Sequence, residues 1–235
     1  MPHPDTTQAA TVQTATAQAA TTQAALPRRL LLIGASGLVG AHALALALAD
    51  PRVARVVAPT RRALPAHPKL ENPIVDFEAL PRDAAWWAAD GTVSALGTTI
   101  RVAGSQAAFR RVDVDYVVET AALARAAGVR AFALNTALGA DPSARNFYLR
   151  CKGEAERGVE ALDFPALTLV RPALIGGERA QPRPMERLAI RLTNALSPLL
   201  PRRYRVVHAE RIARRLLEGA LRDEPGLRIV ESEAI

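Results

Sequence analysis

Short apolar runs alternate along most of the chain with longer segments of helical spacing. Runs that are apolar throughout predict strands at residues 30–33, 53–58, 92–96, 129–134 and 167–170, with weaker ones at 74–77 and 227–230. Apolar positions three and four apart predict helices at residues 38–49, 113–127, 147–162, 185–196 and 211–221. Continuously apolar strands that alternate with helices are typical of a parallel sheet covered on both faces. The pattern therefore predicts an α/β fold with a doubly wound parallel sheet.

The two ends of the chain depart from this pattern. Residues 1–27 consist mostly of Thr, Ala and Gln, so they cannot bury enough apolar surface to offset their ordering entropy, and we expect a disordered leader. Residues 28–235 are predicted to form one domain, in which residues 178–226 make a small C-terminal cap over the substrate side. For the helix at 185–196, a membrane-surface role is the alternative to covering the pocket or forming a subunit contact.

Composition narrows the classes of partner. The net charge is +7, and because the arginines are spread along the chain without a long basic run, no nucleic-acid partner is expected. The glycines and polar residues within 30–49 disfavour a membrane span there, and no membrane partner is expected. The single cysteine, Cys151, and the lack of a recognisable targeting signal indicate a reducing cytoplasm, and no metal-ligand cluster is present in the sequence.

A glycine-rich turn joins the first predicted strand to the first helix. Its Gly-x-x-Gly-x-x-Gly spacing lets the backbone approach a pyrophosphate, while the helix behind it offers free N–H groups and the positive end of its dipole. This context, strand then glycines then helix, indicates a dinucleotide-binding Rossmann fold. The predicted cofactor-binding residues of the turn are Gly34, Ser36, Gly37, Leu38, Val39 and Gly40.

The end of the second predicted strand indicates which dinucleotide binds. An NAD site usually places a carboxylate there to bind the ribose hydroxyl groups, but this chain has Thr60, Arg61 and Arg62. Guanidinium groups suit a 2′-phosphate, so we expect NADP, with NADPH preferred over NADH. Asp76 and Phe77, at the end of the predicted third strand, are the expected adenine contacts.

A tyrosine and a lysine form the predicted catalytic pair. Tyr148 and Lys152 are four residues apart on a predicted helix and therefore share a face. A nearby ammonium favours the phenolate form, so Tyr148 could exchange a proton with a carbonyl or alcohol, and Lys152 could also hold the nicotinamide ribose. Thr136 is the candidate for polarising the substrate oxygen, with Asn135 as the alternative.

These motifs together resemble a known family. From residue 30 to about residue 177 the chain is similar to the atypical short-chain dehydrogenase/reductases, and more closely to the small NAD(P)-binding proteins related to the Tat-interacting oxidoreductase of animals. The segments that carry the resemblance are residues 34–40, 95–99, 112–116, 139–141, 146–154 and 171–172, with a weaker likeness at 230–235.

The resemblance implies a bound NADP and assigns further residues to it. Leu96, Gly97 and Thr98 would line the nicotinamide side of the cofactor, and Pro172 would lie near the nicotinamide amide. The tyrosine and the lysine would take the family's active-site roles. The departure is Thr136, because the family pattern has serine there, and the branched side chain restricts the rotamers of the hydroxyl.

The leading hypothesis is therefore an NADP-dependent oxidoreductase that acts on a small carbonyl or alcohol substrate, with Tyr148 as the acid/base. The first alternative is a regulatory protein that senses NADPH without turnover. The second is an epimerase or dehydratase of nucleotide sugars, for which the region after residue 177 is short. Expected partners are a small-molecule substrate and, as one alternative, a second copy of the chain in a homodimer.

Overall fold

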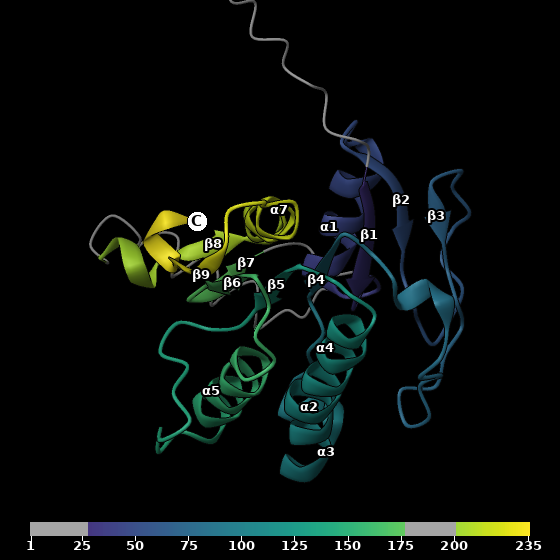
Figure 1. The fold of residues 1–235 in the computed structure, drawn as a ribbon. Helices are drawn as coiled ribbons and strands as arrows, with labels where there is room; N and C mark the ends of the chain where they lie inside the picture. The colour runs from purple at the N-terminus through teal and green to yellow at the C-terminus, as the bar shows by residue number, and fades with distance from the viewer. Residues whose placement is uncertain (1–27, 177–200) are drawn as a thin grey trace, which may run out of the picture.

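The structure is a computed structural model, and it describes residues 28–176 and 201–235. Within these ranges, seven parallel strands form one sheet in the order β3-β2-β1-β4-β5-β6-β9 (Figure 1). These strands are β1 (Arg28–Ile33), β2 (Val53–Val57), β3 (Leu70–Glu71), β4 (Gly91–Ser94), β5 (Ala131–Asn135), β6 (Ala166–Arg171) and β9 (Gly226–Glu231). A separate parallel pair consists of β7 (Leu174–Gly176) and β8 (Val206–His208). The predicted doubly wound parallel sheet is confirmed.

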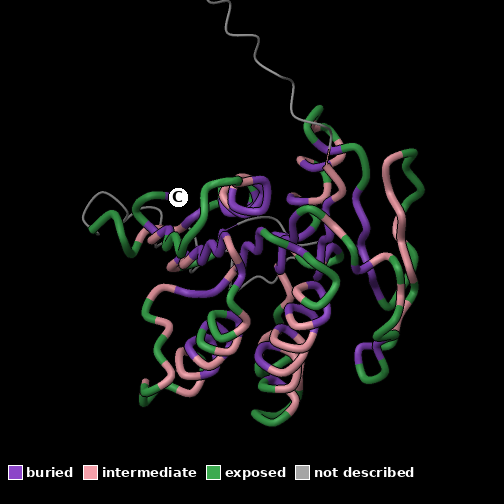
Figure 2. The backbone as a smooth tube through the Cα atoms, viewed as in Figure 1, coloured by how far each residue is buried: buried purple, intermediate pink, exposed green. Residues whose placement is uncertain are grey.

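Helices cover both faces of the sheet. On one face α1 (Leu38–Ala49) packs against α7 (Ala209–Ala220), and on the other α4 (Tyr116–Ala126) packs against α5 (Phe147–Glu160) (Figure 1). Each face has its own hydrophobic cluster, and buried residues follow the central strands and the inner sides of these helices (Figure 2). The shorter helices are η1 (Ala85–Trp87), α2 (Ile100–Ala103), α3 (Gln106–Arg110), η2 (Arg111–Asp115), η4 (Arg202–Tyr204) and η5 (Ser232–Ala234).

The strand order reverses between β1 and β4. The chain runs outward from β1 through β2 to β3, then returns to β4 on the other side of β1 and continues to β5 and β6. In open α/β sheets, ligands bind outside the carboxyl ends of the strands at this reversal point. The ends of β1 and β4 are in register, with Ile33 opposite Ser94, so the segments that follow these two residues lie side by side at the reversal point.

Two segments differ from the sequence-based prediction. The third strand is Leu70–Glu71 rather than 74–77, where a single bridge between Thr60 and Ile74 remains. Pro73 lacks an N–H group for the ladder, which explains why pairing does not continue through it. The helix predicted from residue 113 instead begins with a π-helical stretch, η2, before α4. Apolar spacing does not distinguish a π turn from an α turn.

The last described helix belongs to the layers of the fold. Residues 209–220 form α7, which packs on α1 and over β4, β5 and β6, and it buries Ile212 and Leu216 in the cluster of that face. This part of the region predicted to cap the substrate therefore covers the sheet. Residues 178–200 of the predicted cap, with the helix predicted at 185–196, lie outside the described residues, as does the leader.

Candidate active site

The glycine turn after β1 depends on two residues without side chains. Gly34 has a φ of 86°, and a Cβ atom on it would lie 2.7 Å from backbone atoms of Ala95 and Leu96. A Cβ atom on Gly40 would lie 2.0 Å from the Gly34 carbonyl oxygen. These neighbours are backbone atoms and cannot rotate away, so the turn needs glycine at both positions. The close approach places the turn directly against the end of β4.

The first turn of α1 is free to receive an anion. Gly37 is its N-cap residue and provides no capping side chain, and the first turn contains no acidic residue. The first N–H groups of a helix have no partner within the helix and carry the positive end of its dipole. Of the other predicted residues here, Ser36 is exposed and Val39 is buried on the inner side of α1.

The turn after β2 is organised by a threonine and an asparagine. Thr60 is buried, and its hydroxyl donates a hydrogen bond to the Arg62 carbonyl at 2.7 Å. Asn72 Nδ2 donates to Thr60 Oγ1 at 2.8 Å and to the Ala58 carbonyl at 2.6 Å. The side chains of Thr60 and Asn72 therefore hold the turn, while Arg61 and Arg62 are exposed on it. Asn72 lies 12 residues from Thr60, and no local pattern marked it.

The two expected adenine contacts have different surroundings. Asp76 is exposed and accepts a hydrogen bond from the Glu78 backbone N–H at 2.9 Å. Phe77 is buried, and its ring centroid lies 5.6 Å from that of Tyr116. The Phe77 ring is therefore part of the core on the α4 side of the sheet. Adenine binding by these two residues stays a prediction.

Tyr148 and Lys152 lie in the first half of α5. Asn146 caps this helix by accepting a hydrogen bond from the Leu149 N–H at 3.1 Å. The Tyr148 side chain is exposed at the helix start, whereas Lys152, one turn later, is buried. The Lys152 ammonium lies 5.8 Å from the centre of the Tyr148 ring. The shared face expected from the spacing therefore brings the two groups together.

An aspartate that the sequence reasoning did not assign completes this group. Asp113 is buried in η2, and its Oδ1 lies 2.6 Å from Lys152 Nζ. Its Oδ2 accepts a hydrogen bond from the Thr98 N–H at 2.8 Å. Burial on its own lowers the pKa of Lys152, but the charge and hydrogen bond of Asp113, together with the nearby Tyr148 and Cys151, outweigh it, and the pKa is raised above its ordinary value. The only signal in the sequence was that Asp113 lies in a segment resembling the family.

Of the residues expected on the nicotinamide side, Gly97 and Thr98 lie next to this pair. A Cβ atom on Gly97 would lie 3.2 Å from Asp113 Oδ1 and 3.6 Å from Lys152 Nζ, so the lack of a side chain there leaves room for both groups. Leu96 is half-buried against the hydrophobic cluster of the α4 side. Pro172 is buried, and its carbonyl accepts a hydrogen bond from the Leu138 N–H at 2.9 Å.

Asn135 is the last residue of β5 and Thr136 follows it, at the carboxyl edge of the sheet beside β6. The Thr136 backbone N–H donates to the Val170 carbonyl at 2.9 Å, which fixes the residue beside β6. Thr136 Oγ1 and Asn135 Oδ1 are buried and have no hydrogen-bond partner among the described residues. A buried polar group without a partner is costly, so each such group in a folded protein calls for an explanation. A ligand that hydrogen-bonds Thr136 would provide one.

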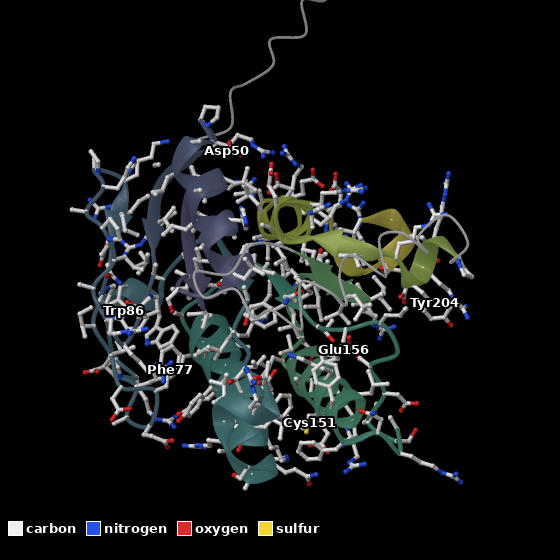
Figure 3. All side chains as sticks on the ribbon, turned by 180° about the vertical axis from the view of Figure 1, so that it is seen from behind. Asp50, Phe77, Trp86, Cys151, Glu156 and Tyr204 are labelled. Atoms are coloured by element: carbon white, nitrogen blue, oxygen red, sulfur yellow. The ribbon has the colours of Figure 1, made fainter. Side chains whose placement is uncertain are left out.

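A second group of charged side chains joins α5, β6 and β9. Arg171, at the end of β6 and next to Pro172, pairs with the buried Glu156 of α5 at 2.6 Å and with Glu231 of β9 at 3.2 Å. Glu156 lies one turn beyond Lys152 on α5, the helix that also carries Cys151 (Figure 3). Arg171 therefore links the helix that carries Tyr148 and Lys152 to two neighbouring strands of the sheet.

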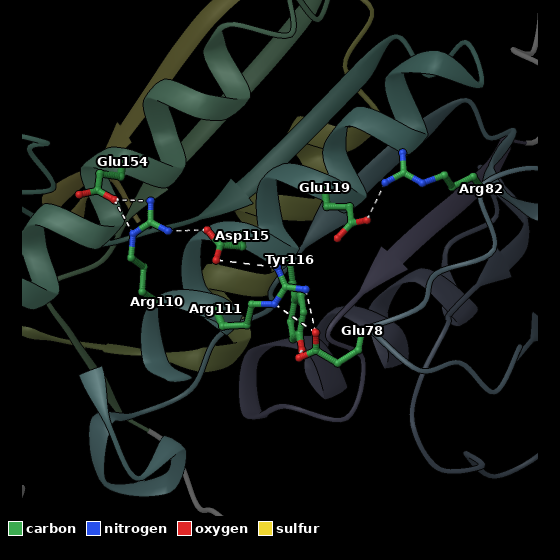
Figure 4. A network of polar contacts seen from close by, with 8 residues as sticks. All are labelled: Glu78, Arg82, Arg110, Arg111, Asp115, Tyr116, Glu119 and Glu154. Atoms are coloured by element: carbon green, nitrogen blue, oxygen red, sulfur yellow. Dashed lines mark hydrogen bonds and ion pairs between the residues drawn. The ribbon is translucent and has the colours of Figure 1, made fainter. Parts of the chain in front are cut away.

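The outer sides of the neighbouring helices carry an exposed network of ion pairs. It joins the segment between β3 and η1 to η2 and α4, and it joins α3 to η2 and α5, through the residues Glu78, Arg82, Arg110, Arg111, Asp115, Tyr116, Glu119 and Glu154 (Figure 4). Exposed pairs of this kind contribute little to stability because solvent screens them. We therefore expect this network to add little to stability, in contrast to the buried Asp113–Lys152 pair.

The residues at this edge of the sheet fit a dinucleotide. The glycine turn leaves a cradle that a Cβ atom would fill, and the N-terminus of α1 behind it suits a pyrophosphate. The Thr136 hydroxyl, which has no hydrogen-bond partner in the described part of the chain, and the buried Lys152 lie farther along the same edge, where a nicotinamide and a substrate would meet. Within the described ranges, no group of His, Cys, Asp and Glu side chains is arranged to hold a metal, and no helix is long and apolar enough to cross a membrane.

Known proteins are similar to this chain well beyond the individual motifs. No family model matches the chain. It is 34% identical over 214 residues to the protein HTATIP2 of Rattus norvegicus, and the match covers 88% of each chain. The chain belongs to this family of atypical short-chain dehydrogenase/reductases. A fungal member, the mitochondrial protein fmp52 of Emericella nidulans, is 36% identical over 177 residues, which cover 70% of this chain and 74% of the relative.

Solved structures show the same fold at lower identity. The structure of MoeE5 in complex with UDP-glucuronic acid and NAD has a TM-score of 0.67 and 20% identity, covering 86% of this chain and 75% of the other. The PhqB reductase domain from Penicillium fellutanum has a TM-score of 0.61 and 18% identity, covering 87% and 67%. These likenesses confirm the Rossmann-type α/β fold.

The relatives correct one prediction. Those from Emericella nidulans, Aspergillus fumigatus and Meyerozyma guilliermondii are all named mitochondrial, so the predicted cytoplasmic localisation is wrong. The prediction relied on a single cysteine and on the composition of the leader. A free thiol indicates a reducing environment but does not distinguish one reducing compartment from another. Leader composition was too weak a signal to decide the compartment.

Proposed function

We propose that the protein is an NADP-dependent oxidoreductase that interconverts a small carbonyl compound and its alcohol. The observation that carries this proposal is the placement of Tyr148, exposed at the start of α5, beside the buried Lys152 ammonium. An accessible phenol next to a fixed cation is suited to acid/base chemistry on a substrate oxygen. Membership of the short-chain dehydrogenase/reductase family supports the same class of reaction.

In the reducing direction, Tyr148 is the proton donor. Bound NADPH would supply the hydride that adds to the carbonyl carbon. Hydride addition converts the C=O double bond to a single bond, and negative charge develops on its oxygen. Tyr148 Oη donates its proton to that oxygen and is later reprotonated from solvent. Thr136 Oγ1 donates a hydrogen bond that polarises the same oxygen, and Lys152 holds the nicotinamide ribose.

The preference for NADPH over NADH rests on the turn after β2. Thr60 occupies the place where an NAD site has a carboxylate, and its hydroxyl is already used within the turn. Arg61 and Arg62 follow it on the exposed side of the turn, where two guanidinium groups could bind a 2′-phosphate bidentately.

A binding titration of NADPH and NADH tests the cofactor. We expect the wild type to prefer NADPH by about tenfold or more, equivalent to about 1.4 kcal/mol, and the Arg61→Ala/Arg62→Ala variant to lose that preference without weakening NADH. The matched control is Arg214→Ala/Arg215→Ala on α7, which removes the same two charges from exposed ion pairs. Equal binding of the two cofactors would remove the 2′-phosphate argument, and binding of neither would overturn the proposed function.

A nucleotide-sugar epimerase is the second candidate, favoured by one observation. MoeE5, which shares the fold, is described in complex with UDP-glucuronic acid and NAD. An enzyme of that kind retains its cofactor through the catalytic cycle, so denaturing the purified protein and identifying the released nucleotide separates the two candidates. Release of stoichiometric NAD would favour the epimerase, and absence of bound nucleotide would favour exchangeable NADPH.

A further inference from the structure

The ion pair between Lys152 and Asp113 is removed from solvent. The two side chains are 8% and 1% exposed, and Nζ lies 2.6 Å from Oδ1. A buried ammonium without a counter-charge is strongly destabilising, because the protein interior cannot replace its hydration. The Asp113 carboxylate supplies the counter-charge that the buried Lys152 ammonium needs. Among the described residues, Tyr148 and Cys151, both on α5, also act on the ammonium and raise its pKa.

Each carboxylate oxygen of Asp113 has a different partner. Oδ1 contacts the ammonium of α5, while Oδ2 accepts the Thr98 N–H, which belongs to the turn after β4. One side chain from η2 therefore bridges two elements that approach the site from different strands. Gly97 is part of this arrangement, because a Cβ atom there would press against Oδ1 at 3.2 Å.

The π-helical stretch separates Asp113 from its acidic neighbour. Asp113 points into the protein, whereas Asp115 in the same stretch lies at the surface and pairs with Arg110 and Arg111. π turns in proteins occur frequently at functional sites. The stretch thus contains one carboxylate at the site and one outside it, which provides a control of the same residue type.

We propose that Asp113 is a positioning residue of the active site, which holds the Lys152 ammonium and the Gly97–Thr98 turn in a fixed relation before any cofactor binds. The inference rests on the proposed function, in which this lysine and this turn face the nicotinamide end of NADPH. Asp113 acts through Lys152 and Thr98 and touches neither the substrate nor the hydride-bearing ring. Its role is thus separable from the proton transfer of Tyr148.

Lysine NMR tests the pair directly, because Lys69 and Lys152 are the only lysines in the chain. A protein labelled with carbon-13 at lysine Cε gives two signals, and Lys69→Arg assigns them. In the wild type without cofactor, we expect the Lys152 signal to remain that of a charged ammonium at pH 10.5, the ordinary lysine pKa. Because the pKa of Lys152 is raised, the ion pair persists through neutral pH and is lost only above pH 10.5.

The Asp113→Asn variant removes the charge and keeps an oxygen that can accept the Thr98 N–H. We expect the midpoint of the Lys152 titration to fall by about one pH unit or more, because the Asp113 charge then no longer opposes desolvation. We expect NADPH to bind about tenfold more weakly, equivalent to about 1.4 kcal/mol. Asp115→Asn, the matched control, should change neither result.

Two results would overturn the inference. One is a Lys152 titration that is the same in Asp113→Asn and the wild type; the other is unchanged NADPH affinity in a folded Asp113→Asn variant whose Lys152 titration has shifted. If Asp113→Asn does not fold, the wild-type titration decides, and loss of the Lys152 proton below pH 10.5 overturns the pair. A wild type that binds no NADPH sinks the proposed function, and the titration in the free protein distinguishes that failure from this one.

Discussion

The glycine turn and the Tyr148–Lys152 side of the site meet at the same edge of the sheet, but they hold their geometry by different means. The turn is built from backbone: Gly34 and Gly40 contact carbonyl and amide atoms that cannot move aside. The other side is built from side chains on β5, η2 and α5, joined by the buried Asp113–Lys152 pair. Changes in the first side should therefore affect folding and cofactor binding together, whereas changes in the second can alter chemistry while the fold stays intact.

The largest effect is expected at Gly40. In Gly40→Ala the new methyl group would lie 2.0 Å from the Gly34 carbonyl oxygen, so the turn or α1 has to shift. Forcing extra volume into a packed site typically costs about 1–3 kcal/mol, and a clash with backbone belongs at the upper end or beyond. We expect a loss of about 3 kcal/mol in the free energy of unfolding, measured by urea denaturation, together with loss of NADPH binding.

Gly37→Ala is the matched control in the same turn. Its φ of −80° suits any residue, and the nearest atom to a new Cβ, the Gly34 carbonyl oxygen, is 3.3 Å away. We expect a much smaller loss of stability than for Gly40→Ala. Equal destabilisation by the two variants would contradict the view that the Gly40 contact sets the geometry of the turn.

A smaller and purely chemical effect is expected at Thr136. Thr136→Val removes the hydroxyl but keeps the shape, and that hydroxyl has no hydrogen-bond partner among the described residues. Replacing an unpartnered buried polar group by an apolar one is nearly neutral or stabilising, so the free energy of unfolding should stay the same or rise slightly. Turnover should fall about 10–100-fold if the hydroxyl polarises the substrate oxygen, equivalent to about 1.4–2.7 kcal/mol in the barrier.

Thr136→Ser completes this test, because it restores the family's serine and keeps the hydroxyl. Its turnover on a carbonyl substrate should remain close to the wild-type value. A Thr136→Val variant as active as Thr136→Ser would show that the hydroxyl takes no part in the reaction, and would return Asn135 to consideration as the polarising group.

The backbone-built side was also the easier one to predict from sequence. Three glycines between an apolar run and a helical pattern specify a turn whatever lies elsewhere in the chain. The strand positions followed in the same way, since residues 30–33 of β1 and 131–134 of β5 are buried and all apolar. The third strand was misplaced because the pairing that fixes it, at Leu70–Glu71, depends on β2 and not on its own apolar pattern.

The side-chain-built side was predicted only where a local motif exists. Tyr148 and Lys152 are four residues apart, so helical spacing alone indicated that they share a face. Asp113 is 39 residues from Lys152, and Asn72 is 12 from Thr60. Contacts over such separations depend on the packing of α4, α5 and the sheet, and neither periodicity nor composition encodes them.

The central claim is that Tyr148 transfers the proton that accompanies hydride transfer. The direct test is NADPH oxidation by Tyr148→Phe and the wild type over the same panel of small aldehydes and ketones, with NADPH binding measured on both. We expect turnover to fall about 10²–10⁴-fold in the variant, the usual contribution of general acid/base catalysis, while NADPH affinity stays within about twofold. Undiminished turnover by Tyr148→Phe on a substrate that the wild type reduces would contradict the account.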